Sequence, residues 1–291
     1  MTLDEIAERL RAAGIDPDDA RREAMLLVEA FAGASFASML ADRSRSYDAP
    51  ELKAAVDRRA RRIPLQYILG RWEFCGLPFR VTEDCLIPRP DTEVVAERAA
   101  ELLPEDGRFL DLCTGSGCIA GAVLSLSLAK GRHTTGCAVE LVPETAELAR
   151  ENLRALGFSD RCQVLTGDLR NAASLLSRPT DAKEDNRFDV IVSNPPYVTA
   201  EEMETLAPEL SHEPRIALTD EGDGLSLIRA IVRLYPPYLK DTGVLLIEHG
   251  WRQAEAVRSL AEEAGLKWSP LYDYGGHVRA GEMRLTNAPR L

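Results

Sequence analysis

Apolar residues recur three and four positions apart through the first 70 residues of the chain, the spacing that lines one face of an α-helix. The opening set is Leu3, Ile6, Ala7 and Leu10, and a second set follows a turn-forming Gly-Ile-Asp-Pro stretch. Almost no strand signal interrupts them. The pattern predicts a small all-helical domain over residues 1–70. Its helices are expected near residues 3–10, 25–31, 35–41 and 50–62.

Between residues 72 and 87 the pattern changes to that of strands. Phe74, Leu77, Phe79 and Val81 alternate with polar residues, and a glycine and a proline interrupt the run. Short alternating runs separated by turn residues favour a β-hairpin. We therefore expect a β-hairpin linker over residues 71–88.

From residue 89 to the end, short apolar runs alternate with longer helical stretches, and a polar stretch at 178–187 is expected to be an exposed loop. This alternation is typical of an α/β domain with a mainly parallel sheet. The strand candidates are 109–112, 137–140, 162–165, 190–193 and 244–248. The helix candidates are 117–129, 143–156 and 225–239.

Composition and charge restrict the class of protein. The chain has 291 residues, of which 45% are hydrophobic and 28% are charged, so it can fill a sizeable core. Its 35 Lys and Arg against 47 Asp and Glu leave a net charge of −12, which disfavours binding to duplex nucleic acid through phosphate contacts alone. Residues 1–70 hold 11 basic and 12 acidic residues. Because the basic ones concentrate at 58–62, we hypothesise a local basic patch, including Arg58 and Arg59, that meets a protein partner.

The cysteines and histidines do not suggest a metal site. The six cysteines form no CxxC pair and the four histidines are scattered, so we expect no bound metal and a reducing compartment. The first ten residues are acidic and amphipathic, unlike a signal peptide, and no apolar run is long enough to cross a bilayer. We expect a cytoplasmic protein with no membrane association.

A strand-like run ending in Asp111 leads into a glycine turn and then a helix, over Phe109–Gly117. Gly115 and Gly117 allow a tight turn that brings the backbone close to a ligand, and Asp111 adds an acceptor at the strand end. No lysine of a nucleoside-triphosphate loop follows, which disfavours that class.

Two further acids follow the next two predicted strands. Glu140 ends one strand at the distance where this topology places an acid on ribose hydroxyls, and Asp168 ends the next, where a carboxylate can accept from an adenine amine. Three acids at consecutive strand ends describe an adenosine-containing cofactor. NAD satisfies the same set of residues.

The fourth strand candidate continues into Asn194-Pro195-Pro196-Tyr197. The two prolines stiffen the backbone and remove N–H donors, which leaves carbonyl groups facing a ligand. A planar NH₂ group can donate one hydrogen to Asn194 and the other to the Pro195 carbonyl, with Tyr197 against its face. This arrangement points to methyl transfer from S-adenosylmethionine onto an amide or amine nitrogen, so Asn194, Pro195 and Tyr197 are the candidate catalytic residues.

Taken together, the sequence motifs resemble the PrmC/HemK family, the protein-glutamine methyltransferases that modify the GGQ-motif glutamine of class I peptide chain release factors. The resemblance implies a class I (Rossmann-like) methyltransferase domain over 89–291 with a mainly parallel seven-stranded sheet, and a helical substrate-recognition domain over 1–70. The segments that carry the resemblance are DLCTGSG at 111–117, AVE at 138–140, GDL at 167–169, SNPPY at 193–197, QYILG at 66–70, WEF at 72–74, LIPRPDTE at 86–93, HEPR at 212–215 and DG at 223–224.

The resemblance also implies roles for individual residues. The turn, with Cys113, would hold S-adenosylmethionine, Glu140 its ribose, and Asp168 and Leu169 its adenine. We expect a monomer whose partners are class I release factors. The cofactor-binding candidates are Asp111, Cys113, Thr114, Gly115, Ser116, Gly117, Glu140, Asp168, Leu169 and Asn194. The substrate-binding candidates are Asn194, Pro195, Pro196, Tyr197, Arg89, Pro90 and Glu93.

Three positions depart from the usual family pattern. Cys113 stands where many members have glycine, so the turn either keeps an ordinary negative φ there or strains the cysteine. Glu140 replaces a frequent aspartate, and Leu169 replaces an aromatic residue found in some members.

Other functions share parts of this pattern. A DNA or RNA adenine methyltransferase also needs a site for a planar amine, but the chain shows neither a target-recognition domain nor an extended basic surface. A glutamine methyltransferase of a large-subunit ribosomal protein shares the SNPPY and HEP segments, whereas PRPDTE at 88–93 favours the release-factor enzyme. A non-catalytic cofactor-binding protein would not need the intact Asn194–Tyr197 motif.

Overall fold

The computed structural model describes residues 1–176 and 187–286, which form two compact units. The helical unit comprises Met1–Trp72 together with Ala207–His212, and the second unit comprises Glu73–Leu206 with Glu213–Leu291. The loop expected over 178–187 lies outside the described residues except for Arg187.

The helices of the first unit begin at residues suited to helix starts. The Thr2 hydroxyl accepts the Glu5 N–H at 3.2 Å, and the Glu5 carboxylate accepts the Thr2 N–H at 2.8 Å, a reciprocal cap on the first helix. Pro17 and Pro50 occupy first-turn positions, where the missing N–H is not needed. The helices are α1 (Leu3–Ala12), α2 (Pro17–Ala32), α3 (Phe36–Ala41), α4 (Pro50–Ala60) and α5 (Leu65–Leu69).

The core of the helical unit lies between α1, α2 and α4. Ile6, Leu10, Leu27, Leu52 and Val56 are fully buried there. Burying each such side chain contributes about 1.5–3 kcal/mol. The prediction of helices in this region is confirmed, although α2 starts earlier than expected because small alanines supply the buried face of its first turns.

Two of the four arginines near residue 60, Arg59 and Arg62, form ion pairs with acids of the same unit. Arg59 is only 5% exposed, and its Nε atom lies 2.6 Å from Glu23 Oε2 while its Nη1 lies 3.0 Å from Glu209 Oε1. Arg62 also contacts Glu209, at 2.7 Å. Both cations neutralise acids inside the helical unit, so the hypothesis that Arg59 faces a partner is wrong.

A β-hairpin within the predicted range 71–88 is confirmed. Strands β1 (Arg71–Phe74) and β2 (Leu77–Arg80) pair through a two-residue turn at Cys75 and Gly76, whose φ angles are +50° and +72°. Positive φ at both positions matches the twist of paired strands. The strand-like pattern had suggested more strand after Val81, but β2 ends at Arg80.

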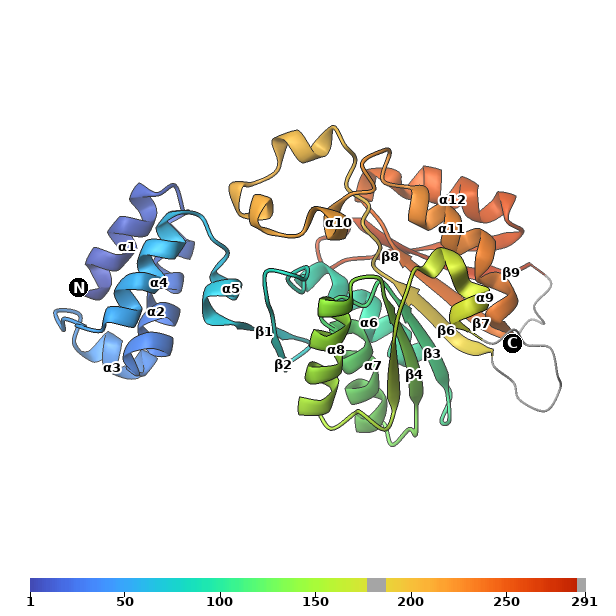
Figure 1. Ribbon diagram of the computed structural model, residues 1–291, viewed down its shortest axis with the longest axis horizontal. Coiled ribbons are helices and arrows are strands. Elements are labelled where there is room, and N and C mark those ends of the chain that lie inside the picture. The colour runs from blue at the N-terminus through green and yellow to red at the C-terminus, as the bar shows by residue number, and fades with distance from the viewer. Residues whose placement is uncertain (177–186, 287–291) are drawn as a thin grey trace. The chain divides into compact units, whose positions relative to one another are not determined.

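The predicted mainly parallel seven-stranded sheet is also confirmed within the described residues, in the order β5-β4-β3-β6-β7-β9-β8 (Figure 1). The first five of these strands run parallel, while β9 pairs antiparallel with both β7 and β8. The strands are β3 (Arg108–Leu112), β4 (Thr135–Glu140), β5 (Cys162–Thr166), β6 (Phe188–Ser193), β7 (Leu239–Glu248), β8 (Leu266–Tyr272) and β9 (Val278–Leu285).

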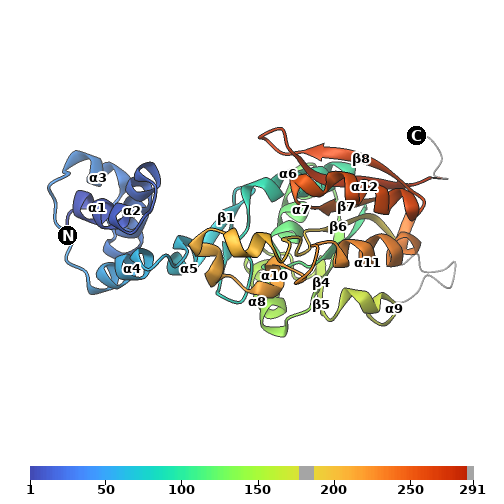
Figure 2. The same cartoon turned by 90° about the horizontal axis from the view of Figure 1, so that it is seen from above.

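Helices cover both faces of this sheet (Figures 1 and 2). Phe109 and Val192 pack with α6, α7 and α8 on one face, whereas Leu110 and Ile191 pack with α11 and α12 on the other. Neighbouring residues of a strand point to opposite faces, so strands buried on both sides are apolar throughout. The helices are α6 (Pro90–Leu102), α7 (Cys118–Ala129), α8 (Pro143–Ala155), α9 (Ala172–Leu175), α10 (Arg215–Leu218), α11 (Ser226–Leu234) and α12 (Ala254–Glu263).

Two details differ from the expected elements. The helix predicted over 225–239 ends at Leu234, because Pro236 and Pro237 follow and the chain continues as a short 3₁₀ turn before β7. Seven of the described elements were not located individually from the sequence, namely helices α5, α6, α9, α10 and α12 and strands β8 and β9.

The strand order predicts a ligand site at the carboxyl ends of the strands, near the middle of the sheet. Chain order runs outward from β3 through β4 and β5 on one side and through β6 and β7 on the other. A crevice forms at the carboxyl ends of the strands where the order reverses, which is the usual ligand position in open α/β sheets. The carboxyl ends of β3, β4, β5 and β6 are the strand ends at which the sequence motifs occur.

Candidate active site

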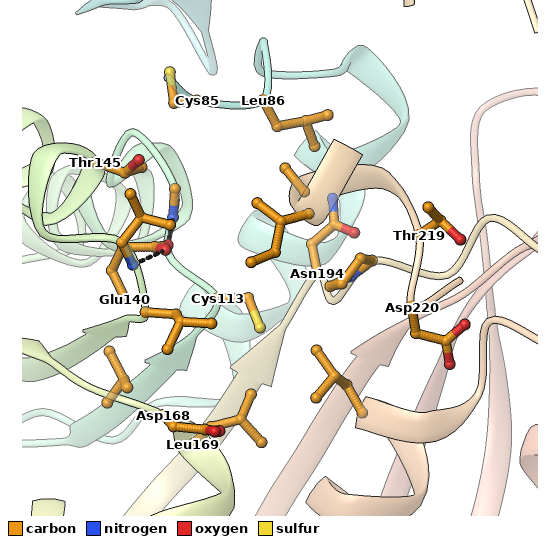
Figure 3. Close-up of a pocket in the computed structure, with 18 of the residues that line it drawn as sticks. Cys85, Leu86, Cys113, Glu140, Thr145, Asp168, Leu169, Asn194, Thr219 and Asp220 are labelled. Carbon is orange, nitrogen blue, oxygen red and sulfur yellow. Dashed lines mark hydrogen bonds between the residues drawn. The ribbon is translucent and has the colours of Figure 1, made fainter. Parts of the chain in front are cut away.

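A cavity of about 500 Å³ opens at the carboxyl ends of β3, β4, β5 and β6. Figure 3 shows Glu140 and Thr145 on one side, Thr219 and Asp220 on the other, and Asn194 between them. Seven candidate residues from the sequence lie in its wall: Cys113, Gly115, Glu140, Asp168, Leu169, Asn194 and Pro196. The structure therefore brings together residues that are up to 83 positions apart in the chain.

The glycine turn after β3 adopts left-handed backbone at three of its positions. Gly115 and Gly117 have φ angles of +57° and +79°, and Cys113 has +59°. Of the two possibilities raised by the sequence at Cys113, the structure has the strained one. A side chain in this conformation costs roughly 1–2 kcal/mol relative to glycine. The Cys113 side chain lines the cavity, and burial raises the pKa of its thiol.

Asp111 supports the turn from behind. Its carboxylate accepts the Thr114 hydroxyl at 2.5 Å and the Ala120 N–H at 3.2 Å, and the residue is fully buried. Burial raises the pKa of Asp111 to about 7, against the opposing effect of these two hydrogen bonds. Asp111, Thr114, Ser116 and Gly117 do not line the cavity, so they shape the turn rather than its inner surface.

Glu140 joins the end of β4 to the same turn. Its Oε2 accepts the Gly115 N–H at 2.9 Å, and its Oε1 accepts the Val142 N–H at 3.0 Å. Each carboxylate oxygen has a second acceptor site, so the group can still accept hydrogen bonds from a ligand in the cavity. These two backbone hydrogen bonds therefore orient the Glu140 carboxylate without the help of a ligand.

The end of β5 contributes one acid and one apolar wall. Asp168 forms an ion pair with Arg170 at 2.7 Å, and the hydrogen bond from that guanidinium lowers the pKa of the carboxyl. Leu169 is buried, and its carbonyl accepts the Tyr235 hydroxyl at 2.7 Å. Because Arg170 already contacts the Asp168 carboxylate, a ligand amine that binds there would share this carboxylate with the Arg170 guanidinium.

The segment Asn194–Tyr197 is held by hydrogen bonds at both ends. Asn194 Nδ2 donates to the Thr92 hydroxyl at 3.1 Å, which leaves its side-chain oxygen as the acceptor it offers. The Tyr197 hydroxyl donates to Glu248 Oε1 at 3.1 Å. Gln253 Nε2 donates to the Tyr197 carbonyl at 3.0 Å. Pro195 and Tyr197 do not line the cavity themselves.

Glu248, at the end of β7, was not among the candidates from the sequence. It is 1% exposed, and burial raises its pKa to about 7, while Thr92, Arg279 and Tyr197 oppose the rise. Burial also raises the pKa of the Tyr197 hydroxyl, and the nearby Glu248 charge adds to this. The signal in the sequence was an acid directly after an apolar strand, the same signal that identified Glu140.

Arg89, Pro90 and Glu93 lie near the site without lining the cavity. Arg89 pairs with the buried Glu213, which also accepts the Ile87 N–H at 3.1 Å. Pro90 starts α6. Glu93 accepts the Cys75 N–H at 2.8 Å and so holds the hairpin turn. Through these contacts the segment before α6 is fixed beside the HEPR motif.

Several cavity residues escaped sequence reasoning. Cys85 and Leu86 come from the loop after the hairpin, and Thr145 comes from α8. Thr219 and Asp220 come from the stretch before α11, where the Asp220 carboxylate accepts the N–H groups of Gly222, Gly224 and Ser226. An aspartate in a glycine-rich stretch is typical of turns in general, so this signal did not distinguish a ligand site.

Histidines contribute little to the site. His249 is fully buried, its Nδ1 lies 2.9 Å from the Gly250 carbonyl, and burial lowers its pKa. His212 is exposed in the helical unit. Over residues 1–176 and 187–286, no group of three His, Cys, Asp or Glu side chains is arranged to hold a metal ion. In the same residues no helix combines the length and apolarity needed to span a membrane.

Comparison with known sequences covers most of the chain. Residues 2–70 match the family described as PrmC N-terminal domain, and residues 78–221 match conserved hypothetical protein 95. A release factor glutamine methyltransferase of Cereibacter sphaeroides is 40% identical over 284 residues, covering 96% of each chain. That of Geobacter sulfurreducens is also 40% identical, over 85% of this chain and 83% of its own. For the Fusobacterium nucleatum relative the identity is 40%, but the match spans only 60% of that protein.

Solved structures share the fold. The catalytic domain of hMettl16, in complex with MAT2A 3′UTR hairpin 6, matches with a TM-score of 0.55 at 17% identity. The match covers 81% of this chain and 84% of that one. At this identity the likeness concerns the arrangement of the sheet and its helices.

Proposed function

The chain belongs to the family of release factor glutamine methyltransferases, and we propose that it transfers a methyl group from S-adenosylmethionine to the GGQ-motif glutamine of class I peptide chain release factors. The acceptor is the side-chain amide nitrogen of that glutamine. The observation that carries this proposal is the position of Asn194 in the cavity wall. Its Nδ2 group donates a hydrogen bond to the Thr92 hydroxyl, which leaves the side-chain oxygen as an acceptor for the substrate. A primary amide offers two N–H donors, of which Asn194 Oδ1 would receive one. We assign the other to the carbonyl of Pro195, which does not line the cavity itself but lies between two residues that do, Asn194 and Pro196.

The cavity fits an adenosine-containing cofactor. Glu140 offers a fixed carboxylate that ribose hydroxyls can donate to, and Leu169 and Val139 provide apolar walls for a purine. The Asp168 carboxylate directly precedes Leu169 in the chain and could accept a hydrogen bond from the purine, although it also forms an ion pair with Arg170. Cavities of 300–1,000 Å³ with a few fixed polar groups are typical of small-molecule sites.

Bound S-adenosylmethionine would supply a methyl group on a cationic sulfur, which leaves as a neutral thioether, so the chain needs no strong acid. The amide nitrogen is a weak nucleophile, because its lone pair is delocalised into the carbonyl group. Asn194 and Pro195 would hold both amide hydrogens and so fix the direction of the nitrogen, and the methylated nitrogen would then lose one of these two protons to water. Fixing reactants near attack distance contributes up to about 7–11 kcal/mol in model systems. We assign this positioning role to Asn194 and Pro195, with the Tyr197 ring supporting the segment.

The remaining assignments are part of the same proposal. The helical unit recognises the release factor, and Arg89, Pro90 and Glu93 hold the loop beside the substrate. The six cysteines are free, which supports a reducing compartment such as the cytoplasm. A monomer is the acting species in this proposal.

Mass spectrometry of a purified release factor, after incubation with the protein and S-adenosylmethionine, tests the proposal. We expect the GGQ-containing peptide to gain the mass of one methyl group on its glutamine. Parallel incubations with large-subunit ribosomal proteins and with DNA examine the other two activities. Methylation of either alternative while the GGQ peptide stays unchanged would overturn the assignment.

The Asn194→Ala variant separates catalysis from cofactor binding. It removes the amide that holds the substrate and leaves Glu140 and the turn in place. We expect cofactor affinity within about three-fold of the unmodified protein, and loss of methyl transfer by roughly a hundred-fold or more. Full activity of this variant would contradict the proposed mechanism.

A further inference from the structure

Both ends of the Asn194–Tyr197 segment lead to the same buried carboxyl group. At one end, Asn194 Nδ2 donates to the Thr92 hydroxyl at 3.1 Å, and Thr92 in turn interacts with Glu248. At the other end, the Tyr197 hydroxyl donates directly to Glu248 Oε1 at 3.1 Å. Thr92 is 2% exposed and Glu248 1% exposed, so water competes little with these contacts.

The direction of these hydrogen bonds determines which way the Asn194 amide faces. The Thr92 side chain lowers the pKa of Glu248, as a hydroxyl does when its proton faces a carboxylate, although the two make no hydrogen bond of ordinary geometry. An ionised carboxylate only accepts hydrogen bonds, so its charge favours this orientation of the Thr92 proton. The Thr92 oxygen is then left to accept, and the amide nitrogen of Asn194 is the group that can donate to it. If the amide turned by half a rotation, its oxygen would meet an oxygen that has no proton to give. Glu248 therefore disfavours the reversed amide, which would present N–H donors to a substrate that also donates.

Keeping Glu248 in this place has a physical cost. Its Oε2 atom is buried and makes no hydrogen bond of ordinary geometry to the described residues. A buried carboxyl that is only partly hydrogen-bonded destabilises a fold. Arg279 is the nearby compensating charge, and Asp91 and Asp273 bind it at 2.9 Å and 3.0 Å. A group held at such a cost next to the segment that contacts the substrate suits a role in the reaction.

We propose that Glu248 and Thr92 are positioning residues, which orient the side-chain amide of Asn194 and the ring of Tyr197 for the incoming substrate amide. Neither residue lines the cavity, so they act through Asn194 and Tyr197. This inference rests on the proposed function, because it assumes that the substrate group is a donor of two hydrogens.

The structure provides matched variants for a kinetic test. Thr92→Val removes the hydroxyl at constant shape, Thr92→Ser retains it, and Glu248→Gln adds donors where the carboxylate only accepts. Thr134→Val is the control, because Thr134 is 1% exposed and its hydroxyl has no hydrogen-bond partner among the described residues. Assays at pH 8.5 keep Glu248 ionised, since its pKa is about 7.

We expect Thr92→Val and Glu248→Gln to lower kcat roughly ten- to a hundred-fold, because the amide loses its fixed direction. The Kd for S-adenosylmethionine should stay within about two-fold, and Thr92→Ser and Thr134→Val should keep nearly full activity. The double variant should lose little more than the more damaging single variant, since both substitutions act on the orientation of the same Asn194 amide. Wild-type kcat in Thr92→Val, or equal losses in kcat and cofactor affinity, would overturn the inference.

A measurement without substrate separates this inference from the proposed function. The Nδ2 protons of Asn194 give side-chain NMR signals, assigned by their disappearance in Asn194→Asp. We expect their hydrogen exchange to accelerate at least several-fold in Thr92→Val and Glu248→Gln, but not in Thr134→Val. Unchanged exchange in both variants would overturn the positioning role even if release-factor methylation is observed. Absence of GGQ methylation by the wild-type chain would instead overturn the proposed function.

Discussion

Glu140 and Gly115 are joined by a hydrogen bond of 2.9 Å, from the Gly115 backbone N–H to Glu140 Oε2. The acid at the end of β4 is therefore part of the glycine turn after β3, although 25 positions separate the two residues. A single contact thus couples the conformation of the turn to the direction of the carboxylate. Cofactor binding and the local stability of the turn are expected to change together when it is broken.

Glu140→Ala removes the acceptor for both the Gly115 and Val142 N–H groups. We expect the affinity for S-adenosylmethionine to fall by at least ten-fold and the free energy of unfolding by about 1–3 kcal/mol, because buried donors lose their partners. Glu140→Gln keeps one carbonyl acceptor and should lose less of both. Titration calorimetry and urea unfolding measure the two quantities. Unchanged affinity in Glu140→Ala would show that this acid does not contact the cofactor.

Gly224 permits the close passage of the Tyr197 carbonyl. A Cβ atom at Gly224 would lie 2.0 Å from that oxygen, and its φ of +71° is unfavourable for any side chain. We expect Gly224→Ala to displace residues 195–197 and to lower kcat roughly ten-fold or more. Gly222→Ala is the control, since its nearest neighbour, an Asp220 oxygen, lies at 3.4 Å. Steady-state kinetics of the pair gives the result, and equal rates would mean that the segment tolerates the shift.

Asp111 makes stability depend on pH. Its pKa is about 7 in the folded chain and near 3.8 when exposed, so the folded state binds the proton more tightly. The stabilisation is complete below the lower pKa and is lost as pH rises through about 7. We expect Asp111→Asn to gain roughly 2–3 kcal/mol relative to the unmodified chain between pH 5 and pH 8. Urea unfolding across this range measures the difference; a constant difference would indicate an ordinary pKa.

Arg59 should matter for the stability of the helical unit. It bridges Glu23 and Glu209 while almost fully buried, and its removal leaves two acids without their partner. We expect Arg59→Ala to reduce the free energy of unfolding of that unit by about 3 kcal/mol. The exposed Arg22 on α2 provides the comparison, and Arg22→Ala should stay within about 0.5 kcal/mol. If both variants unfold alike, the ion pairs contribute nothing measurable.

Much of this architecture could be predicted because it depends on local patterns. Phe109–Leu112 and Val190–Ser193 are apolar throughout, which is typical of strands buried on both faces, and the structure has strands there. The glycine turn and the Asn-Pro-Pro-Tyr motif are contiguous, so their backbone constraints act within a few residues. Hairpin β1–β2 was predictable for the same reason. The predicted ends of two helices differ from the structure. Helix α11 ends before the proline pair Pro236 and Pro237, and α2 begins earlier than predicted because alanines supply its first buried positions.

What the sequence determined by itself was the type of each element, the class of fold and the chemistry available at the strand ends. It could not decide the direction in which a polar side chain faces, because that depends on partners distant in the chain. Asn194 meets Thr92 across 102 positions and Tyr197 meets Glu248 across 51. Arg59 became an internal ion-pair residue because Glu23 and Glu209 both lie against it. Hydrogen bonds and ion pairs act over a few ångströms, so only the tertiary structure decides which of these side chains face the cavity and which support it.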